Sequence, residues 1–271
     1  MQLTYSSMQE TLMRELRLYH HPIAVYFLTS DEMVEQFKKN TDYSIPVKPL
    51  TYCQWEIAAR MQAKTILGTK EHLGCTNGQV SFGWREIDDK EVKSQSKYCV
   101  DQAQAERFLR SKPKMPLNSV KAVAIGPLGT APMQPDVVHF YCDNLQSYHL
   151  AVDYMAGTDT HPLRPMVTMS SSACGGSVFS HLEQTFNMCP ACSGSYNAGK
   201  TERGEVNVFI PGPHIEATVK RLLQRIHNSG SSSITRPGDP FPGADICKNC
   251  PIIIFKKEGD TPEECAGCTK Q

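Results

Sequence analysis

Short runs of consecutive apolar residues alternate along the chain with stretches in which apolar residues recur at every third or fourth position. The first pattern predicts buried strands, and the second predicts helices with one buried face. The predicted strands are 23–28, 120–125, 136–141 and 206–210.

Polar residues that can cap a helix precede most of the helical stretches. Ser7 and Thr51 each begin a capping-box pattern, and Asn144 is placed to cap a helix that Gly157 ends. Ser30 is placed to cap another helix. Further helices are predicted over 101–110, 177–186 and 213–227, with turns over 170–176.

The alternation of strands and helices predicts an α/β domain, a mixed sheet with flanking helices, over residues 1–227. Residues 228–244 are rich in Ser, Gly and Pro, which is typical of a linker. Residues 245–271 form a short cysteine-bearing tail. The tail is too short to bury a core, so a bound metal would give it a reason to fold.

Composition narrows the class of protein. Hydrophobic residues make up 40% of the 271 residues, which is enough for a core and excludes a disordered chain. The 28 basic and 28 acidic residues cancel, so the chain lacks the basic field of a nucleic-acid-binding protein. No apolar stretch reaches the roughly 18 residues of a membrane span. The N-terminus has no signal-peptide pattern, and we therefore expect a cytoplasmic protein.

Cysteine is the outlier of the composition, with 11 residues. Disulfides seldom persist in the cytosol, so this number indicates metal ligation, redox chemistry or buried free thiols. Cys99 and Cys142 are expected to be structural, because neither lies in a pattern that suggests a site.

The tail carries two CxxC hooks, Cys247–Cys250 and Cys265–Cys268, separated by 14 residues. Each hook presents two thiolates from one turn, so the pair can surround an ion tetrahedrally. The spacing leaves zinc and an iron–sulfur cluster as open alternatives.

The predicted domain carries further cysteines in turns or at helix starts. Cys53 lies at a predicted helix start, Cys75 in a glycine-bearing loop, and Cys174 before two glycines that let backbone approach a bulky ligand. Cys189 and Cys192 form a third CxxC, which is a redox pair, half of a metal site or incidental. The set suits a cluster assembled by the fold, and single buried thiols are the alternative.

These segments together resemble a known family. The matching pieces are Pro22–Val25, Cys53 with the helix 55–63, Cys75 with Gly78 and Phe82–Gly83, Ile125–Leu128, Pro135–Val138, Ala173–Cys174 and Phe209–Pro211. The chain is similar over about residues 10–226 to the family of domain of unknown function 169, which is common in anaerobic bacteria and archaea. The resemblance implies a cytosolic protein in which Cys53, Cys75 and Cys174 recur, and it implies no reaction. The Cys189–Cys192 hook and the tail look like additions to the family pattern.

Two other features are candidate chemistry. Gly194–Thr201 matches the phosphate-binding pattern GxxxxGKT, but the predicted flanks lack the strand and the helix that a P-loop needs. If this segment is a loop and not a P-loop, Lys200 and Arg203 are expected to face an anionic substrate. His72 lies three residues before Cys75 and is a candidate proton donor or ligand.

The sequence thus predicts a cytosolic iron–sulfur protein of an anaerobe. A cluster, expected to be of the 4Fe-4S type, would be held by Cys53, Cys75 and Cys174 with Cys189 or Cys192, and the tail would hold a second cluster or zinc. The protein would be an oxidoreductase, a cluster-dependent lyase or an electron carrier. Its partner would be a small-molecule substrate or a redox protein. A non-enzymatic zinc-knuckle module and phosphate or nucleotide binding at 194–201 are the alternatives. The sequence does not indicate an oligomeric state.

Overall fold

The computed structural model describes residues 3–168, 170–197 and 199–229. The chain divides into two units, Met1–Ile234 and Thr235–Gln271, and all the described residues belong to the first. The tail hooks at Cys247–Cys250 and Cys265–Cys268 therefore lie outside the described residues. No helix of the described part is long and apolar enough to cross a membrane.

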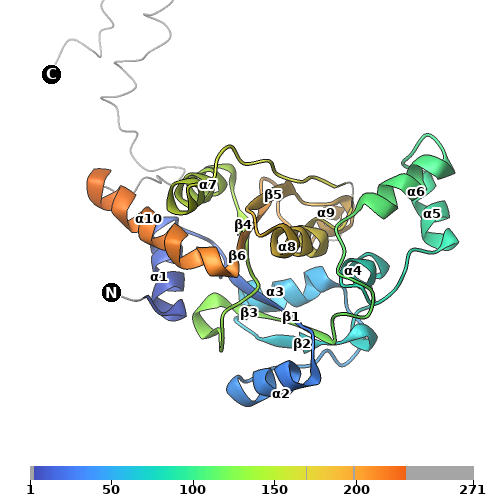
Figure 1. Ribbon diagram of the computed structural model, residues 1–271, viewed down its shortest axis with the longest axis horizontal. Helices are drawn as coiled ribbons and strands as arrows, with labels where there is room; N and C mark the ends of the chain where they lie inside the picture. The colour runs from blue at the N-terminus through green and yellow to red at the C-terminus, as the bar shows by residue number, and fades with distance from the viewer. Residues whose placement is uncertain (1–2, 169, 198, 230–271) are drawn as a thin grey trace, which may run out of the picture. The chain divides into compact units, whose positions relative to one another are not determined.

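A six-stranded sheet with the strand order β2-β3-β1-β4-β6-β5 forms the centre of the domain (Figure 1). The strands are β1 (Ile23–Leu28), β2 (Ile66–Gly68), β3 (Ala122–Pro127), β4 (Val137–Cys142), β5 (Asn187–Pro190) and β6 (Val206–Pro211). In the centre, β1 pairs with both β3 and β4, and β6 then pairs with β4 and β5.

Helices and single 3-10 turns fill the connections between the strands. The helices are α1 (Tyr5–Glu15), α2 (Asp31–Asn40), α3 (Tyr52–Gln62), α4 (Thr76–Ser81), α5 (Asp89–Ser96), α6 (Gln102–Ser111), α7 (Asn144–Thr158), α8 (Ser172–Glu183), α9 (Ser193–Asn197) and α10 (Ile215–Ser229). The 3-10 turns are η1 (Lys70–His72), η2 (Leu128–Thr130) and η3 (Gly212–His214).

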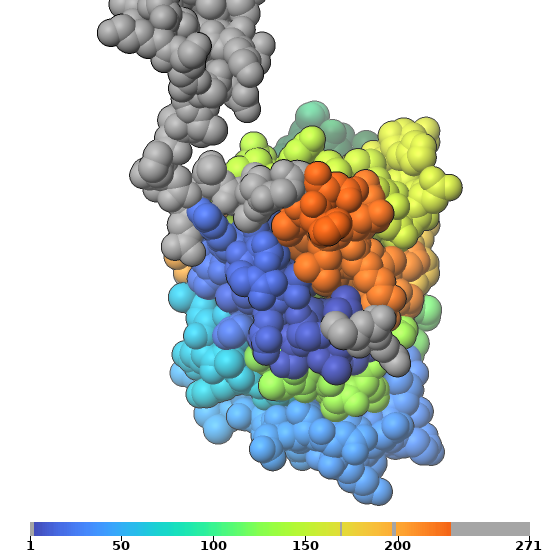
Figure 2. All heavy atoms as spheres, turned by 90° about the vertical axis from the view of Figure 1, so that its left-hand side faces the viewer, coloured from blue at the N-terminus to red at the C-terminus, as the bar shows by residue number. Residues whose placement is uncertain are grey.

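Two hydrophobic cores lie on opposite faces of the sheet, because successive strand residues point to opposite sides. Tyr26 of β1 joins the core under α1, α2, α7 and α10, and its neighbour Val25 joins the core under α3, α4 and α8. Figure 1 shows these two groups of helices on either side of the sheet, and Figure 2 shows α1 lying beside α10. Both faces of the sheet are covered, so β1, β3 and β4 are buried at every position.

A smaller core joins α5 to α6 away from the sheet, through Val92, Ala105 and Leu109. In Figure 1 this helix pair projects from the rest of the domain. The segment that returns from α6 to β3 passes alongside α4.

The prediction of a mixed sheet is wrong, because all six strands pair antiparallel. Within the described residues, parallel pairing is limited to isolated bridges such as Ser44–Ile66. Uninterrupted apolar strands are typical of parallel sheets, but an antiparallel sheet covered on both faces shows the same pattern. The sequence analysis also missed β2 and β5, whose three and four residues are too few to form a periodic pattern.

Several helix ends differ from the prediction by a few residues. Thr4 caps α1 and Ser7 takes the reciprocal position in that capping box, while Asp143 rather than Asn144 caps α7. The cap at Thr51 is confirmed. The predicted turn over 170–176 is wrong from Ser172 onward, since α8 runs through two glycines that propensity alone disfavours.

Candidate functional site

Five cysteines gather on the face of the sheet covered by α3, α4 and α8. Cys174 and Cys189 are buried in this core, Cys53 and Cys75 pack against it, and the backbone N–H of Cys192 donates to Ser172 Oγ at 2.8 Å. Cys53, Cys75 and Cys192 are partly exposed, so solvent reaches the group from their side. We call this set of five the thiol group.

Each of these side chains is positioned by the start or end of an element. The Thr51 hydroxyl accepts the N–H of Gln54 and fixes the first turn of α3, which carries Cys53. Cys75 is the residue that precedes α4, and Cys174 lies in the first turn of α8. Cys189 is the third residue of the four-residue strand β5, and Cys192 directly precedes α9.

Cys174 lies at the centre of the thiol group. Burial raises the pKa of Cys174 to about 12, and the neighbouring Cys75 and Cys192 raise it as well. Burial, Glu56 and then Cys174 and Cys192 hold the pKa of Cys53 well above its ordinary value. The thiols are thus near enough to oppose one another's ionisation.

Cys189 and Cys192 differ although they share one CxxC hook. Burial raises the pKa of Cys189 to about 12, and its Sγ donates to the carbonyl of Ser172 at 3.7 Å. Burial also tends to raise the pKa of Cys192. Hydrogen bonds from Ser172 and from the backbone of Ser195 and Ser171 outweigh burial, so the pKa of Cys192 is lowered. Cys192 therefore ionises more readily than Cys189.

The separation of the side chains limits whether the thiol group can bind a single metal ion. Within residues 3–168, 170–197 and 199–229, no three Cys, His, Asp or Glu side chains lie close enough together to hold a metal ion. Among the described residues, the thiols therefore interact electrostatically with one another without forming a site for a single ion.

Lys112 is buried next to the thiol group. Its Nζ donates to Asn77 Oδ1 at 2.8 Å and to Ser170 Oγ at 3.4 Å, and the residue is only 3% exposed. Burial lowers the pKa of Lys112, while Cys174 is the largest influence that raises it. The sequence analysis missed this residue, because a lysine after a polar helix end carries no local sign of burial.

A buried polar network lies next to Cys53. Glu56 Oε1 is 2.7 Å from His139 Nδ1, and Tyr141 donates its hydroxyl to Glu56 Oε2 at 2.6 Å. His139 Nε2 is 3.0 Å from Asn207 Oδ1, and both Glu56 and His139 are fully buried. The sequence analysis missed this network. Two sequence features could have indicated it: a carboxylate on the apolar face of α3 and a histidine inside an apolar strand.

Arg60 extends this network toward the surface. Its guanidinium lies 3.9 Å from the centre of the Tyr141 ring, and it pairs with Glu205 at 2.9 Å. The same side chain donates to the carbonyl of Lys200 at 3.0 Å, which ties down the loop that follows α9. Burial would raise the pKa of Glu205, but hydrogen bonds from His20 and the Glu202 backbone, together with Arg60, lower it to about 2.

The three predicted catalytic residues make hydrogen bonds to groups other than the thiols. His72 Nδ1 accepts the N–H of Thr69 at 3.1 Å within η1. Arg203 donates to the Tyr196 hydroxyl at 3.1 Å, and both Arg203 and Lys200 belong to the loop before β6. The helix α9 lies inside the GxxxxGKT match and β6 follows it, so the strand-loop-helix of a P-loop is not formed.

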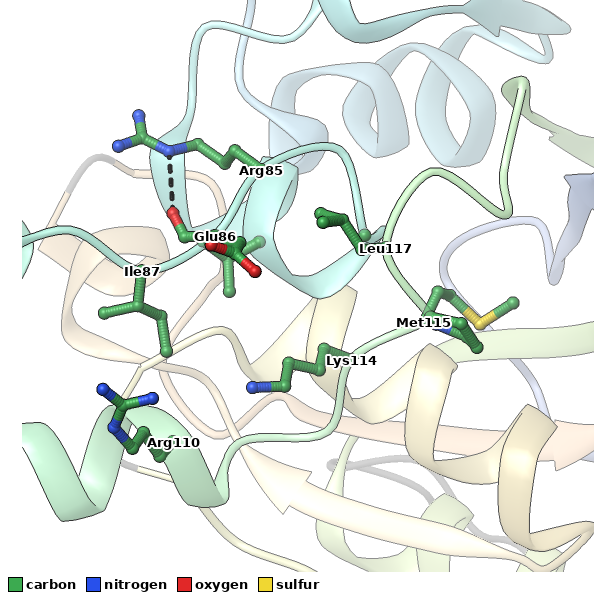
Figure 3. A pocket seen from close by; sticks show the side chains of 10 residues that line it. Arg85, Glu86, Ile87, Arg110, Lys114, Met115 and Leu117 are labelled. Atoms are coloured by element: carbon green, nitrogen blue, oxygen red, sulfur yellow. Dashed lines mark hydrogen bonds between the residues drawn. The ribbon is translucent and has the colours of Figure 1, made fainter.

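A cavity of about 360 Å³ is lined by the segments that follow α4 and α6 (Figure 3). Its wall depends on Gly83, which has a φ of +71° and where a Cβ would overlap the carbonyl oxygen of Pro116. Arg85 and Arg110 line it but are paired with acidic residues, Asp88 and Glu106. Lys114 also lines the cavity, two residues beyond Lys112 on the same segment. No cysteine lines the cavity.

The two cysteines expected to be structural lie elsewhere. Cys142 is buried in the core on the opposite face of the sheet, and Cys99 packs against the small core between α5 and α6. Neither belongs to the thiol group.

The sequence comparisons agree with the resemblance carried by the cysteine-bearing segments. Residues 11–221 match the model of the family DUF169, described as "Uncharacterised ArCR, COG2043". No curated protein and no solved structure matches the chain. The matched range includes all five residues of the thiol group and Lys112. The chain therefore belongs to the DUF169 family.

Proposed function

We propose that the domain is a redox protein that binds a 4Fe-4S cluster through Cys53, Cys75, Cys174 and Cys192. The single observation that carries the proposal is the gathering of thiols from α3, α4, α8 and the β5–α9 hook around Cys174. Donors that are all sulfur favour iron–sulfur clusters, zinc or copper(I) over hard cations such as Mg²⁺ or Ca²⁺.

The spacing of the thiols favours a cluster over a single ion. Thiolates that ligate one zinc ion converge on a point, whereas those that ligate a four-iron cluster lie around a larger body. The described residues contain no single-ion site, yet their thiols oppose one another's ionisation. This combination suits a ligand that fills the space between the sulfur atoms.

Cys189 is the thiol that the proposal leaves out. Its proton is used in the hydrogen bond to the Ser172 carbonyl, and burial raises its pKa to about 12. Cys192, on the same hook, has a lowered pKa and partial exposure. One ligand from the hook and one each from α3, α4 and α8 make the expected set of four.

The chain's own residues would support such a centre in two ways. Backbone amides around Cys192 favour thiolate over thiol. The partly exposed side at Cys53, Cys75 and Cys192 lets a redox partner or a small molecule approach. A bound cluster would supply one-electron transfer.

The proposal is tested on the full-length chain with the four tail cysteines replaced by Ser, purified without oxygen. We expect iron and sulfide in stoichiometric amounts, with a visible absorption band that dithionite bleaches. Single Ser substitutions of Cys53, Cys75, Cys174 or Cys192 should each lower bound iron on the order of tenfold.

Three cysteines provide matched controls for these substitutions. Cys189→Ala tests the choice of ligand within the hook, and Cys99→Ala and Cys142→Ala remove thiols outside the thiol group. All three variants should keep the iron. A colourless protein that binds neither iron nor sulfide, or equal iron loss in the controls, would refute the proposal.

A further inference from the structure

Lys112 connects two of the elements that carry the thiol group. Its Nζ donates to Asn77 Oδ1 at 2.8 Å and to Ser170 Oγ at 3.4 Å. Asn77 lies in the first turn of α4, two residues after Cys75, and Ser170 lies four residues before Cys174 of α8. A buried ammonium group is therefore held between the start of α4 and the segment that leads into α8.

Among the described residues, a thiol influences the charge of Lys112 more than any carboxylate does. Burial lowers the pKa of Lys112, and an ionised Cys174 is the largest influence that raises it, ahead of Glu91. Glu91 makes its ion pair with Arg85, at 3.6 Å. In return, Lys112 favours the thiolate of Cys174 against the effect of burial. The lysine and the thiol group are thus charge partners.

A thiolate-bound cluster would suit a lysine in this position. Burying an ammonium group is costly unless opposite charge lies nearby. A 4Fe-4S cluster with four thiolate ligands carries a net negative charge, and one-electron reduction makes this charge more negative. Salt and water screen buried charges only weakly, so a buried lysine acts strongly on the energy of each oxidation state.

We propose that Lys112 is the internal counter-charge of the thiol group: its ammonium group stabilises the reduced cluster more than the oxidised cluster and so raises the midpoint potential. The inference rests on the proposed function and adds to it a residue that tunes the centre without ligating it. In the step concerned, one electron passes from a reduced electron-carrier protein to the cluster. No bond changes at Lys112, which keeps its proton throughout.

A purely structural role is the alternative, since the hydrogen bonds of Lys112 also hold Asn77 and Ser170 in place. Three substitutions separate the two roles. Lys112→Met removes the charge and keeps the length of the side chain, Lys112→Gln removes the charge and keeps a donor, and Lys112→Arg keeps the charge. Lys114→Met is the matched control, because Lys114 is exposed and lies two residues away on the same segment.

The test is an anaerobic redox titration of the full-length chain with the four tail cysteines replaced by Ser. Lys112→Met should lower the equilibrium constant for one-electron reduction of the cluster at least tenfold, which corresponds to about 59 mV, while bound iron stays the same. Lys112→Arg should keep most of the original constant. Lys114→Met should leave it unaltered.

The possible outcomes separate this inference from the proposed function. An original protein without iron refutes both. An unchanged potential in a Lys112→Met protein that keeps its iron overturns the inference alone, and so do equal shifts in the Met and Arg variants.

If Lys112→Met loses its iron, the other two variants decide. Iron kept by Lys112→Arg but lost by Lys112→Gln supports a required charge, and iron lost by both assigns a structural role and overturns the inference. Iron kept by both moves the tenfold criterion to the potential of Lys112→Gln.

Discussion

Buried charges in this domain are matched to partners in some places and unmatched in others. Asp153 receives two hydrogen bonds from Arg225, and Glu56 is held by His139 and Tyr141. Such pairs are costly to break, because the remaining partner is left buried with its charge. Lys112 is the contrasting case, because both of its hydrogen-bond acceptors, Asn77 and Ser170, are neutral.

At the residue scale we predict that Glu205→Gln destabilises the domain near neutral pH by about 2 kcal/mol, after allowance for solvent screening. The lowered pKa of Glu205, about 2, means that the folded state favours the carboxylate, which pairs with Arg60. This stabilisation is present above the unfolded pKa of the carboxyl. It is lost as pH falls from about 4.5 toward about 2.

Urea unfolding at several pH values measures the effect. The variant should lose less stability over that acid range than the original protein. Glu202→Gln, an exposed change three residues away, should leave both the stability and its pH profile unaltered. Identical acid profiles for the original protein and Glu205→Gln would contradict the prediction.

Among the elements, α8 connects the core to the candidate site. Its two glycines have different surroundings: a Cβ at Gly176 would overlap the ring of Phe209 on β6, while Gly175 borders Ser171 and Ser81. Both glycines were interpreted from sequence as room for a bulky ligand. Gly176 instead lets the helix approach the sheet, and this close approach fixes the position of Cys174.

At the element scale we predict that Gly176→Ala lowers the free energy of unfolding by about 1–3 kcal/mol, because the added methyl group overpacks the interface with Phe209. Gly175→Ala is the matched control in the same helix. Its methyl group would meet only ordinary contacts, so stability should stay the same or rise slightly. Denaturant midpoints of the two variants compare them directly, and equal losses would disprove the packing argument.

At the scale of the whole molecule, the sheet separates two different environments. The core under α1, α2, α7 and α10 contains Cys142 as its only cysteine among the described residues, whereas the other core gathers the thiol group. Both cores, as far as the structure describes them, are built from the sheet and the helices α1 to α10. The domain should therefore fold and keep its site without the tail.

We predict that a chain ending at residue 229 keeps the melting temperature of the full-length domain within a few degrees and keeps its bound iron. Only metal held by the tail hooks should be lost. Full-length protein with Ser at Cys247, Cys250, Cys265 and Cys268 separates loss of the hooks from loss of the chain. Unfolding of the truncated chain, or disappearance of its domain-bound iron, would show that the site depends on the tail.

Local signals predicted much of the fold. The strand over 23–28 and the cap at Thr51 are encoded by a few neighbouring residues, and the structure confirms both. The cysteines of the thiol group were also recognisable from the sequence, through a CxxC hook and through positions in loops and at predicted helix starts.

The sequence by itself determined the four long strands, most of the long helices, the family of the chain and the cysteines worth examining, because these depend on residue type and short-range spacing. Only the tertiary structure decided that the sheet is antiparallel, that Cys174 is the centre of the thiol group, and that Lys112 is buried beside it. These features arise from contacts between segments tens of residues apart. Such contacts are set by how helices pack on both faces of the sheet, which no local pattern records.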